Sequence, residues 1–281
     1  MKKDSRRLSS SREEELSDLG EVIAARHKGL IDPIEIAHSN RITLSFGDYA
    51  DAFDGLLEAK AGAFHIYCNL RRVEQKDSAR SRFTLAHELG HYFIDEHRNA
   101  LLAGVVPSHP SFCDYQSSNL VEVEADCFAS SLLMPFSRFS AAANEETKGL
   151  VGVLNLASLF QTSISATAIR YLQMNLFPCV IIKWNKDGGY SWKRLSRSAY
   201  LAKLRKTVDN IENLPRDCPT AKVLKKTTTG LVESGTTKAT WFPFVHASCE
   251  DNSIFYEQAI SLGKYGALTF IYPENFTTKP R

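Results

Sequence analysis

The sequence has few cysteines, and none of them are closely paired. Six cysteines are scattered through 281 residues without a CxxC motif. This scattered pattern fits reduced thiols better than a disulfide framework or a cysteine-ligated zinc ribbon. We expect reduced, buried thiols of the kind found in cytoplasmic proteins.

A long apolar run is also missing. The N-terminal stretch MKKDSRRLSSSREEEL is charged and lacks the apolar segment of a secretory signal. The longest uncharged stretch lies between Lys148 and Arg170, and it contains Asn155, Gln161 and several hydroxyl side chains. We therefore expect no export, no membrane span and a cytoplasmic location.

The remaining composition is that of a globular protein. Hydrophobic residues make up 43% of the chain, which is enough to bury a core, and the net charge is +2. The length of 281 residues suggests two or three compact units. The periodicity of the first half predicts a helix over 12–28, strands over 41–46 and 63–69, a helix that begins at Asp77 or Ser78, and a helix over 121–134 that ends before Pro135.

The stretch FTLAHELGHYFIDEH, residues 83–97, carries the clearest chemical motif. His87 and His91 are four residues apart, so a helix presents both imidazoles to one ion. Glu88 follows the first histidine and can act as a general base on water, which is the logic of the HExxH metallopeptidases. Gly90 costs the helix about 1 kcal/mol relative to alanine, so we expect another element to pack closely against it.

His97 is one candidate for a third metal ligand. It lies six residues beyond His91, the spacing that metzincins use, but those enzymes have a glycine midway that turns the chain. Ile94 occupies that place here. Without the glycine we expect the helix to continue, which would turn His97 to another face.

The segment VEVEAD offers the other candidates. A catalytic zinc often takes two histidines and a glutamate, and water fills the fourth position. Glu122 and Asp126 are four residues apart on the second helix, so Glu122 is our favoured ligand and Asp126 can orient a zinc histidine from behind. Glu124 points to the opposite side and remains, with His97, an alternative ligand.

Taken together, RFTLAHELGH and EVEADCFASSLLMP resemble the ImmA/IrrE family of metallopeptidases, whose members carry HExxH and then an ExEAxxFAxxLLMP helix. The resemblance covers about residues 60–140. It implies a gluzincin-like domain with a small sheet and an HExxH helix, zinc (Zn2+) held by His87, His91 and Glu122, and Glu88 as the catalytic base. Asp126 stands where many relatives have asparagine. The family theme, cleavage of a helix-turn-helix repressor that controls mobile-element or DNA-damage genes, implies a protein substrate of that kind.

Residues 148–175 predict two short helices with a break near Gln161–Ser163, a helix-turn-helix pattern. The second helix offers DNA only Arg170, Gln173 and small hydroxyls. We therefore favour helices that support the peptidase, with DNA contact left open.

The last hundred residues predict a mixed α/β domain. They contain a hairpin over 178–196, a basic helix over 196–213, and strands over 238–248 and 265–274. This layout is similar to the sensor-like, GAF-related domain of longer IrrE-type relatives. Five aromatic residues suit a core better than a ligand pocket: Trp184, Trp192, Trp241, Phe242 and Phe244.

The overall prediction is an α+β chain in three parts: a zinc metallopeptidase domain (1–145), helix-turn-helix-like helices (146–177) and a sensor-like domain (178–281). We expect a zinc endopeptidase of narrow specificity. The competing hypothesis is a regulator that binds DNA or a partner and keeps zinc for structure. Glu88 favours the enzyme, because a structural zinc site needs no general base.

Two details of catalysis are also predicted. Substrate entry should lie between the two helices and the strand over 63–69, whose exposed edge would bind an extended peptide by β-addition. The group that steadies the oxygen of the tetrahedral intermediate is left open among four candidates: His97, Tyr92, His109 and Tyr115.

Overall fold

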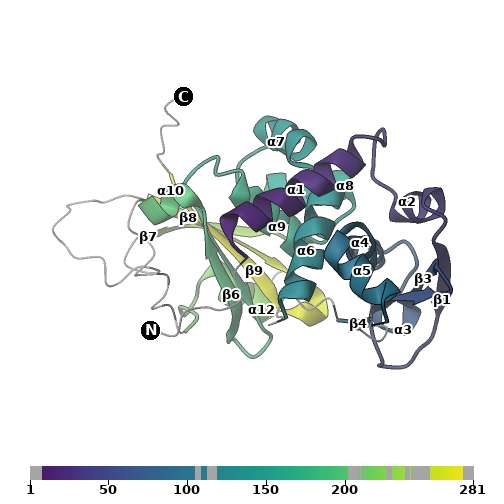
Figure 1. Cartoon of the computed structure of the whole chain (residues 1–281). Coiled ribbons are helices and arrows are strands. Elements are labelled where there is room, and N and C mark those ends of the chain that lie inside the picture. Colours follow the sequence, from purple (N-terminus) through teal and green to yellow (C-terminus); the bar gives the residue numbers. More distant parts are fainter. Residues whose placement is uncertain are drawn as a thin grey trace. The chain divides into compact units, whose positions relative to one another are not determined.

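The structure, a computed structural model, describes residues 8–104, 109–112, 119–201, 208, 211, 213–225, 230–237, 241 and 254–274. The chain mixes helices with two sheets (Figure 1), which confirms the α+β class. It forms two compact units, Met1–Phe139 with Ser158–Ser163, and Ser140–Ala157 with Ile164–Arg281. The predicted helical segment 146–177 is divided between these units.

The sheet of the first unit has four strands in the order β1-β3-β2-β4. They are β1 (Thr43–Gly47), β2 (Gly55–Lys60), β3 (Ala63–Asn69) and β4 (His109–Ser111), and all pairs are antiparallel except β1 with β3. Both predicted strands are present. The predicted substrate-binding edge of the strand over 63–69 is wrong, because β3 pairs with β1 on one side and β2 on the other. The edges of this sheet are β1 and β4.

Two long helices of the first unit pack against each other. They are α4 (Ala79–Phe93), which carries the HExxH motif, and α6 (Leu120–Leu133). A methyl group on Gly90 would lie 3.1 Å from the Cα atom of Ala125 and 3.1 Å from the Phe128 ring. The close packing predicted at Gly90 is therefore present, and α6 is the element that makes it.

The N-terminal helix α1 (Ser10–Ala24) also packs on α6. A methyl on Gly20 would lie 2.9 Å from the Cβ atom of Ser131, so these two helices approach as closely as their backbones allow. The first unit is completed by four shorter helices: α2 (Pro33–Ser39), α3 (Leu70–Val73), α5 (Asp95–Leu102) and the start of α7 (Phe136–Glu145).

Helix α4 does not continue through Ile94 as the sequence predicts. The side chain of Ser78 caps its first turn, and Phe93 is its last residue. Ile94 is extended, with φ −75° and ψ 112°, and α5 begins at Asp95. The buried Ile94 side chain anchors the break in the core, and the acids Asp95 and Glu96 suit the first turn of a new helix. A glycine is therefore not needed to turn the chain here.

The second unit contains an antiparallel sheet in the order β6-β5-β9-β8-β7. Its strands are β5 (Val180–Trp184), β6 (Tyr190–Leu195), β7 (Val232–Thr237), β8 (Ile254–Ser261) and β9 (Ala267–Pro273), so the predicted hairpin and last strand are present. The other elements are α8 (Leu150–Phe160), of which residues 150–157 belong to this unit, α9 (Ile164–Gln173), α10 (Arg197–Leu201), α12 (Pro219–Leu224) and the short 3-10 helix η1 (Gly263–Tyr265). Most of the predicted strand over 238–248 and of the predicted helix beyond residue 201 lies outside the described residues.

Two of the predicted core aromatics fill the centre of the second unit. Trp184 and Trp241 are buried, and the indole of Trp241 donates a 2.7 Å hydrogen bond to the buried carboxylate of Glu257. Trp192 is half-buried on β6. The remaining two lie outside the described residues: Phe242 and Phe244.

The two helices predicted over 148–175 are present as α8 and α9, with a bend of 112° between them. Arg170 is buried and donates to the side chain of Gln173 at 3.0 Å, so α9 does not present this cation to solvent. Within the described residues, no individual helix reaches the length and hydropathy needed to cross a bilayer, although α8 and α9 pass that test when counted together.

The prediction of reduced, buried thiols is confirmed for three of the four described cysteines and is wrong about the burial of Cys127. Four cysteines are free thiols, and all but Cys127 are buried: Cys68, Cys127, Cys179 and Cys218.

Candidate metal centre

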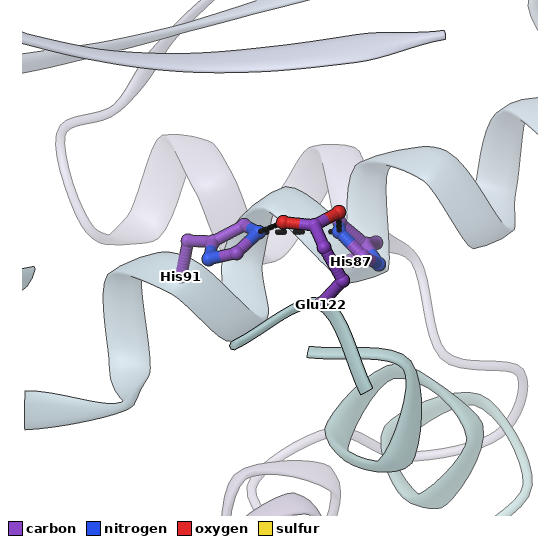
Figure 2. A group of neighbouring side chains, drawn as sticks. All are labelled: His87, His91 and Glu122. Atoms are coloured by element: carbon purple, nitrogen blue, oxygen red, sulfur yellow. Dashed lines mark hydrogen bonds and ion pairs between the residues drawn. The ribbon is translucent and has the colours of Figure 1, made fainter. Parts of the chain in front are cut away.

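Three buried side chains converge where α4 meets α6 (Figure 2). His87 and His91 come from successive turns of α4, and Glu122 comes from the first turn of α6. The two Nε2 atoms are 3.1 Å apart, and the Glu122 oxygens lie 3.3 Å from Nε2 of His87 and 3.5 Å from Nε2 of His91. Ligand bonds of about 2.0–2.1 Å in a tetrahedron place neighbouring donor atoms about 3.3 Å apart. The separations therefore fit a tetrahedral metal ion.

The donor set also fits zinc chemically. Two imidazoles and one carboxylate are a common catalytic zinc set, and they leave the fourth position for water. The same set accepts other divalent transition metals, among which availability selects. The metal site is thus consistent with zinc.

Asp126 lies behind His87, as the four-residue spacing on α6 predicts. The Nδ1 atom of His87 and Oδ1 of Asp126 are 2.8 Å apart. A proton on Nδ1 donated to Asp126 leaves the Nε2 lone pair of His87 directed at Glu122 and His91. Asp126 therefore sets both the orientation and the tautomer that a metal ligand needs.

The charges in this pocket favour a cation. Burial acts to lower the pKa of His87, but hydrogen bonds to Asp126 and Glu122 outweigh it and raise the pKa to about 10. Burial lowers the pKa of His91 to about 4. Burial acts against ionisation of Glu122 as well, yet hydrogen bonds with both histidines lower its pKa. A proton on His87 thus occupies the place where a metal ion would neutralise the same carboxylates.

Glu88 lies beside these ligands, and among the described residues it forms no ion pair with a histidine, whereas Glu122 and Asp126 do. It is fully buried, and within that part of the chain neither carboxylate oxygen has a hydrogen bond of good geometry. Burial raises its pKa to about 7, while His87, the Ser111 hydroxyl and the main chain of Leu57 act to lower it. A carboxyl that titrates near neutrality is suited to exchanging a proton with water.

The two alternative ligands do not reach the cluster. His97 sits on α5, and its Nδ1 atom lies 3.2 Å from Nδ1 of His91, on the side of that ring away from Glu122. Glu124 points to the other side of α6, where it meets His97 at 2.9 Å and Arg12 at 3.0 Å. Because the chain breaks at Ile94 and Glu124 faces away from Glu122 on α6, His97, Glu124 and Arg12 contact one another outside the three candidate ligands.

The candidates for stabilising the intermediate are not all placed. The Tyr92 ring packs edge-on against Phe64, with ring centroids 5.0 Å apart, and His97 lies behind His91. The side chain of His109 and all of Tyr115 fall outside the described residues.

Sequence reasoning missed the residues that cover Glu88. Gly55 opens β2, and Ser111 ends β4 and is fully buried. Gly55 pairs with Ser111 across the sheet, so both lie over the carboxyl of Glu88. A glycine at a strand start and a serine in a loop-rich stretch carry no pattern that points to α4.

Comparison with known proteins agrees with this geometry. The HExxH helix and the buried set of His87, His91 and Glu122, which could hold a metal ion, are features of a metallopeptidase-like domain. Residues 70–172 match the family described as the IrrE N-terminal-like domain, Peptidase_M78. The predicted ImmA/IrrE relationship is thereby confirmed.

A solved structure of a Mycobacterium tuberculosis transcriptional regulator is similar to the chain, with a TM-score of 0.57 and 14% sequence identity. The alignment covers 92% of this chain and 76% of that chain. At this identity the likeness concerns the fold alone. No match was found among curated proteins.

Gly55→Ala is expected to destabilise the first unit. The new methyl would lie 2.6 Å from Oε1 of Glu88 and 2.6 Å from Cγ2 of Thr84, and such overpacking costs about 1–3 kcal/mol. Urea unfolding measures the loss. Gly235→Ala on β7 is the matched control, because no described atom lies within 4 Å of its added methyl. Equal effects of the two substitutions would contradict the close approach at Gly55.

Proposed function

We propose that this protein is a zinc-dependent endopeptidase of narrow specificity that cleaves a regulatory protein, a helix-turn-helix repressor being the favoured substrate. The observation that carries the proposal is the buried set of His87, His91 and Glu122 with Glu88 beside it, within a Peptidase_M78 domain. The arrangement would provide three metal ligands with a base beside them.

In this proposal His87, His91 and Glu122 hold the metal. Bound zinc supplies Lewis acidity to water and to the scissile carbonyl. Glu88 accepts a proton from the attacking water and delivers it to the leaving amine nitrogen. Burial raises the pKa of Glu88 to about 7 in the metal-free chain, which suits a group that exchanges protons near neutral pH.

The burial of the site supports narrow specificity. Glu88 is 0% exposed and Glu122 is 6% exposed, so a peptide bond reaches them only if covering residues move aside. A substrate must therefore bring enough binding energy to displace them, which a specific protein partner can do. Of the two sheet edges, β4 lies nearer Glu88, since Ser111 belongs to it; a substrate strand adding at this end of the sheet would approach the base.

A role in transcription control rests on two supports. The family resemblance concerns repressor cleavage, and the similar solved structure is that of a transcriptional regulator. The second unit, with its separate sheet and core, is a suitable place for the sensor-like function that the sequence predicts.

The alternative is a regulator that binds DNA or a partner and uses zinc only for structure. The likeness to a transcriptional regulator favours it. Two features of this chain disfavour it. Glu88 is kept buried at a cost and forms no ion pair within the described residues, and Arg170 is withdrawn from the surface of α9.

A census of new protein N-termini in the source cells tests the proposal. Wild-type cells are compared with cells carrying Glu88→Gln, under normal growth and under DNA damage. One or a few cut sites in a regulatory protein, absent from the mutant, are the expected result. Identical termini under both conditions would refute proteolysis and favour the zinc-stabilised regulator.

A further inference from the structure

The second histidine of the HExxH motif has an unusual neighbour. Nδ1 of His87 faces the carboxylate of Asp126 at 2.8 Å, whereas Nδ1 of His91 faces another imidazole nitrogen, Nδ1 of His97, at 3.2 Å. A carboxylate can only accept a hydrogen bond here, but a neutral imidazole offers one donor and one acceptor. The tautomer of His91 is therefore decided by what holds His97.

His97 is held on its other side by an anion. Its Nε2 atom lies 2.9 Å from Oε2 of Glu124. Glu124 accepts two hydrogen bonds from the guanidinium of Arg12, at 3.0 and 3.1 Å, which hold it as a carboxylate. Arg12 also meets Glu15 at 2.8 Å and Glu96 at 3.2 Å.

The donor and acceptor roles along this chain follow from the carboxylate. Ionised Glu124 only accepts, so the proton of His97 lies on Nε2 and its Nδ1 is an acceptor. His91 must then donate from Nδ1. This leaves the lone pair of His91 on Nε2, the atom that lies 3.5 Å from Glu122.

We propose that His97, Glu124 and Arg12 form a positioning relay that fixes His91 as an Nε2 metal ligand. His97 takes for His91 the part that Asp126 takes for His87. The relay ties the N-terminal helix α1 to the metal centre, because its member Arg12 lies on that helix. This inference rests on the proposed metal site and adds the residues that orient one of its ligands.

The relay gives His97 a role that differs from direct ligation. A ligand would donate a lone pair to the metal, whereas Nδ1 of His97 accepts a hydrogen bond from Nδ1–H of His91. It also accounts for a charged pair in a semi-buried place, since Glu124 and Arg12 have side chains only 17% and 19% exposed. Partners behind metal-binding histidines typically contribute about 10–100-fold to metal affinity.

Two substitutions of His97 separate the relay from simple packing. In His97→Asn the amide oxygen lies near the place of Nδ1 and can accept from His91, whereas in His97→Gln the amide lies near the place of Nε2 and reaches Glu124 instead. Both remove the ring. His38→Asn on α2 is the control, because His38 is an exposed histidine.

The measurement is the zinc dissociation constant of the full chain, obtained by competition with a chelator. We expect His97→Gln to weaken zinc binding by about 10–100-fold and His97→Asn to remain within about threefold of wild type. Equal losses in both variants, or no loss in either, would overturn the relay. Urea unfolding of each variant shows whether the chain is folded.

A nitrogen-15 spectrum of the histidine rings gives a second readout that needs no metal. In the wild-type protein we expect the ring protons on Nδ1 of His91 and on Nε2 of His97. The opposite assignment would overturn the relay even if zinc binds. If wild-type protein does not bind zinc, the proposed function fails, and this spectrum still decides the relay.

Discussion

Glu88→Gln is expected to lower the rate of substrate hydrolysis by about 10²–10⁴-fold, the usual contribution of a positioned acid or base. Glutamine keeps the shape of the side chain but cannot accept the proton of the attacking water. The three metal ligands are untouched, so zinc content should stay at the wild-type level. The test is a rate measurement on purified protein with the substrate that the census of N-termini identifies, together with metal analysis.

The same substitution should change the pH dependence of stability. Burial raises the pKa of Glu88 from 4.5 to about 7, so between these values the native state binds more protons than the unfolded state. Stability of the metal-free wild type therefore falls as pH rises through this window. Glu88→Gln removes the effect and should be more stable than wild type at pH 8, by up to about 3 kcal/mol, but not at pH 4. For the rate prediction above, hydrolysis by Glu88→Gln at the wild-type rate would show that Glu88 is not the general base.

Glu122→Ala is expected to weaken zinc binding by more than about 100-fold, because losing a ligand costs more than losing an outer partner. It leaves His87 and His91 as an incomplete site, and it also removes one of the carboxylates that raise the pKa of His87. Zinc affinity of the purified chain is the measurement.

Two further alanine variants are compared with Glu122→Ala in the same measurement of zinc affinity. Glu124→Ala removes a member of the outer relay and should cost less than Glu122→Ala. Glu145→Ala removes an exposed acid at the end of α7 and should cost nothing. If Glu122→Ala retains wild-type affinity, the third ligand is a different residue and the geometry of the α4–α6 crossing does not describe the loaded site.

Much of the candidate metal centre could be predicted because its geometry is local. The four-residue spacing of His87 and His91 fixes their common face as soon as a helix forms, and the same spacing links Glu122 with Asp126. The opposite direction of Glu124 follows from helical rotation. Even a close neighbour at Gly90 could be anticipated, since an unfavourable glycine in a helix indicates close packing; that α6 is this neighbour was not predicted.

The predictions failed where the outcome depends on contacts between segments that are separated in the sequence. The edge expected on β3 is occupied by β1, and that pairing joins residues on both sides of β2 in the chain. The helix break at Ile94 depends on burial of its side chain in a core assembled from several elements. Neither feature has a local signal, because hydrophobic burial is not directional and any apolar surface can satisfy it.

By itself, the sequence determined the chemistry of this protein: which groups can bind a metal, which acid stands next to them, and which helix faces they share. Only the tertiary structure decided how these groups are tuned. Gly55 and Ser111 come from other strands to bury Glu88, and Arg12 comes from α1 to hold Glu124 and, through His97, the ring of His91. The reason is physical: spacing within a helix sets direction, whereas protonation and tautomer depend on desolvation and partners that only folding brings together.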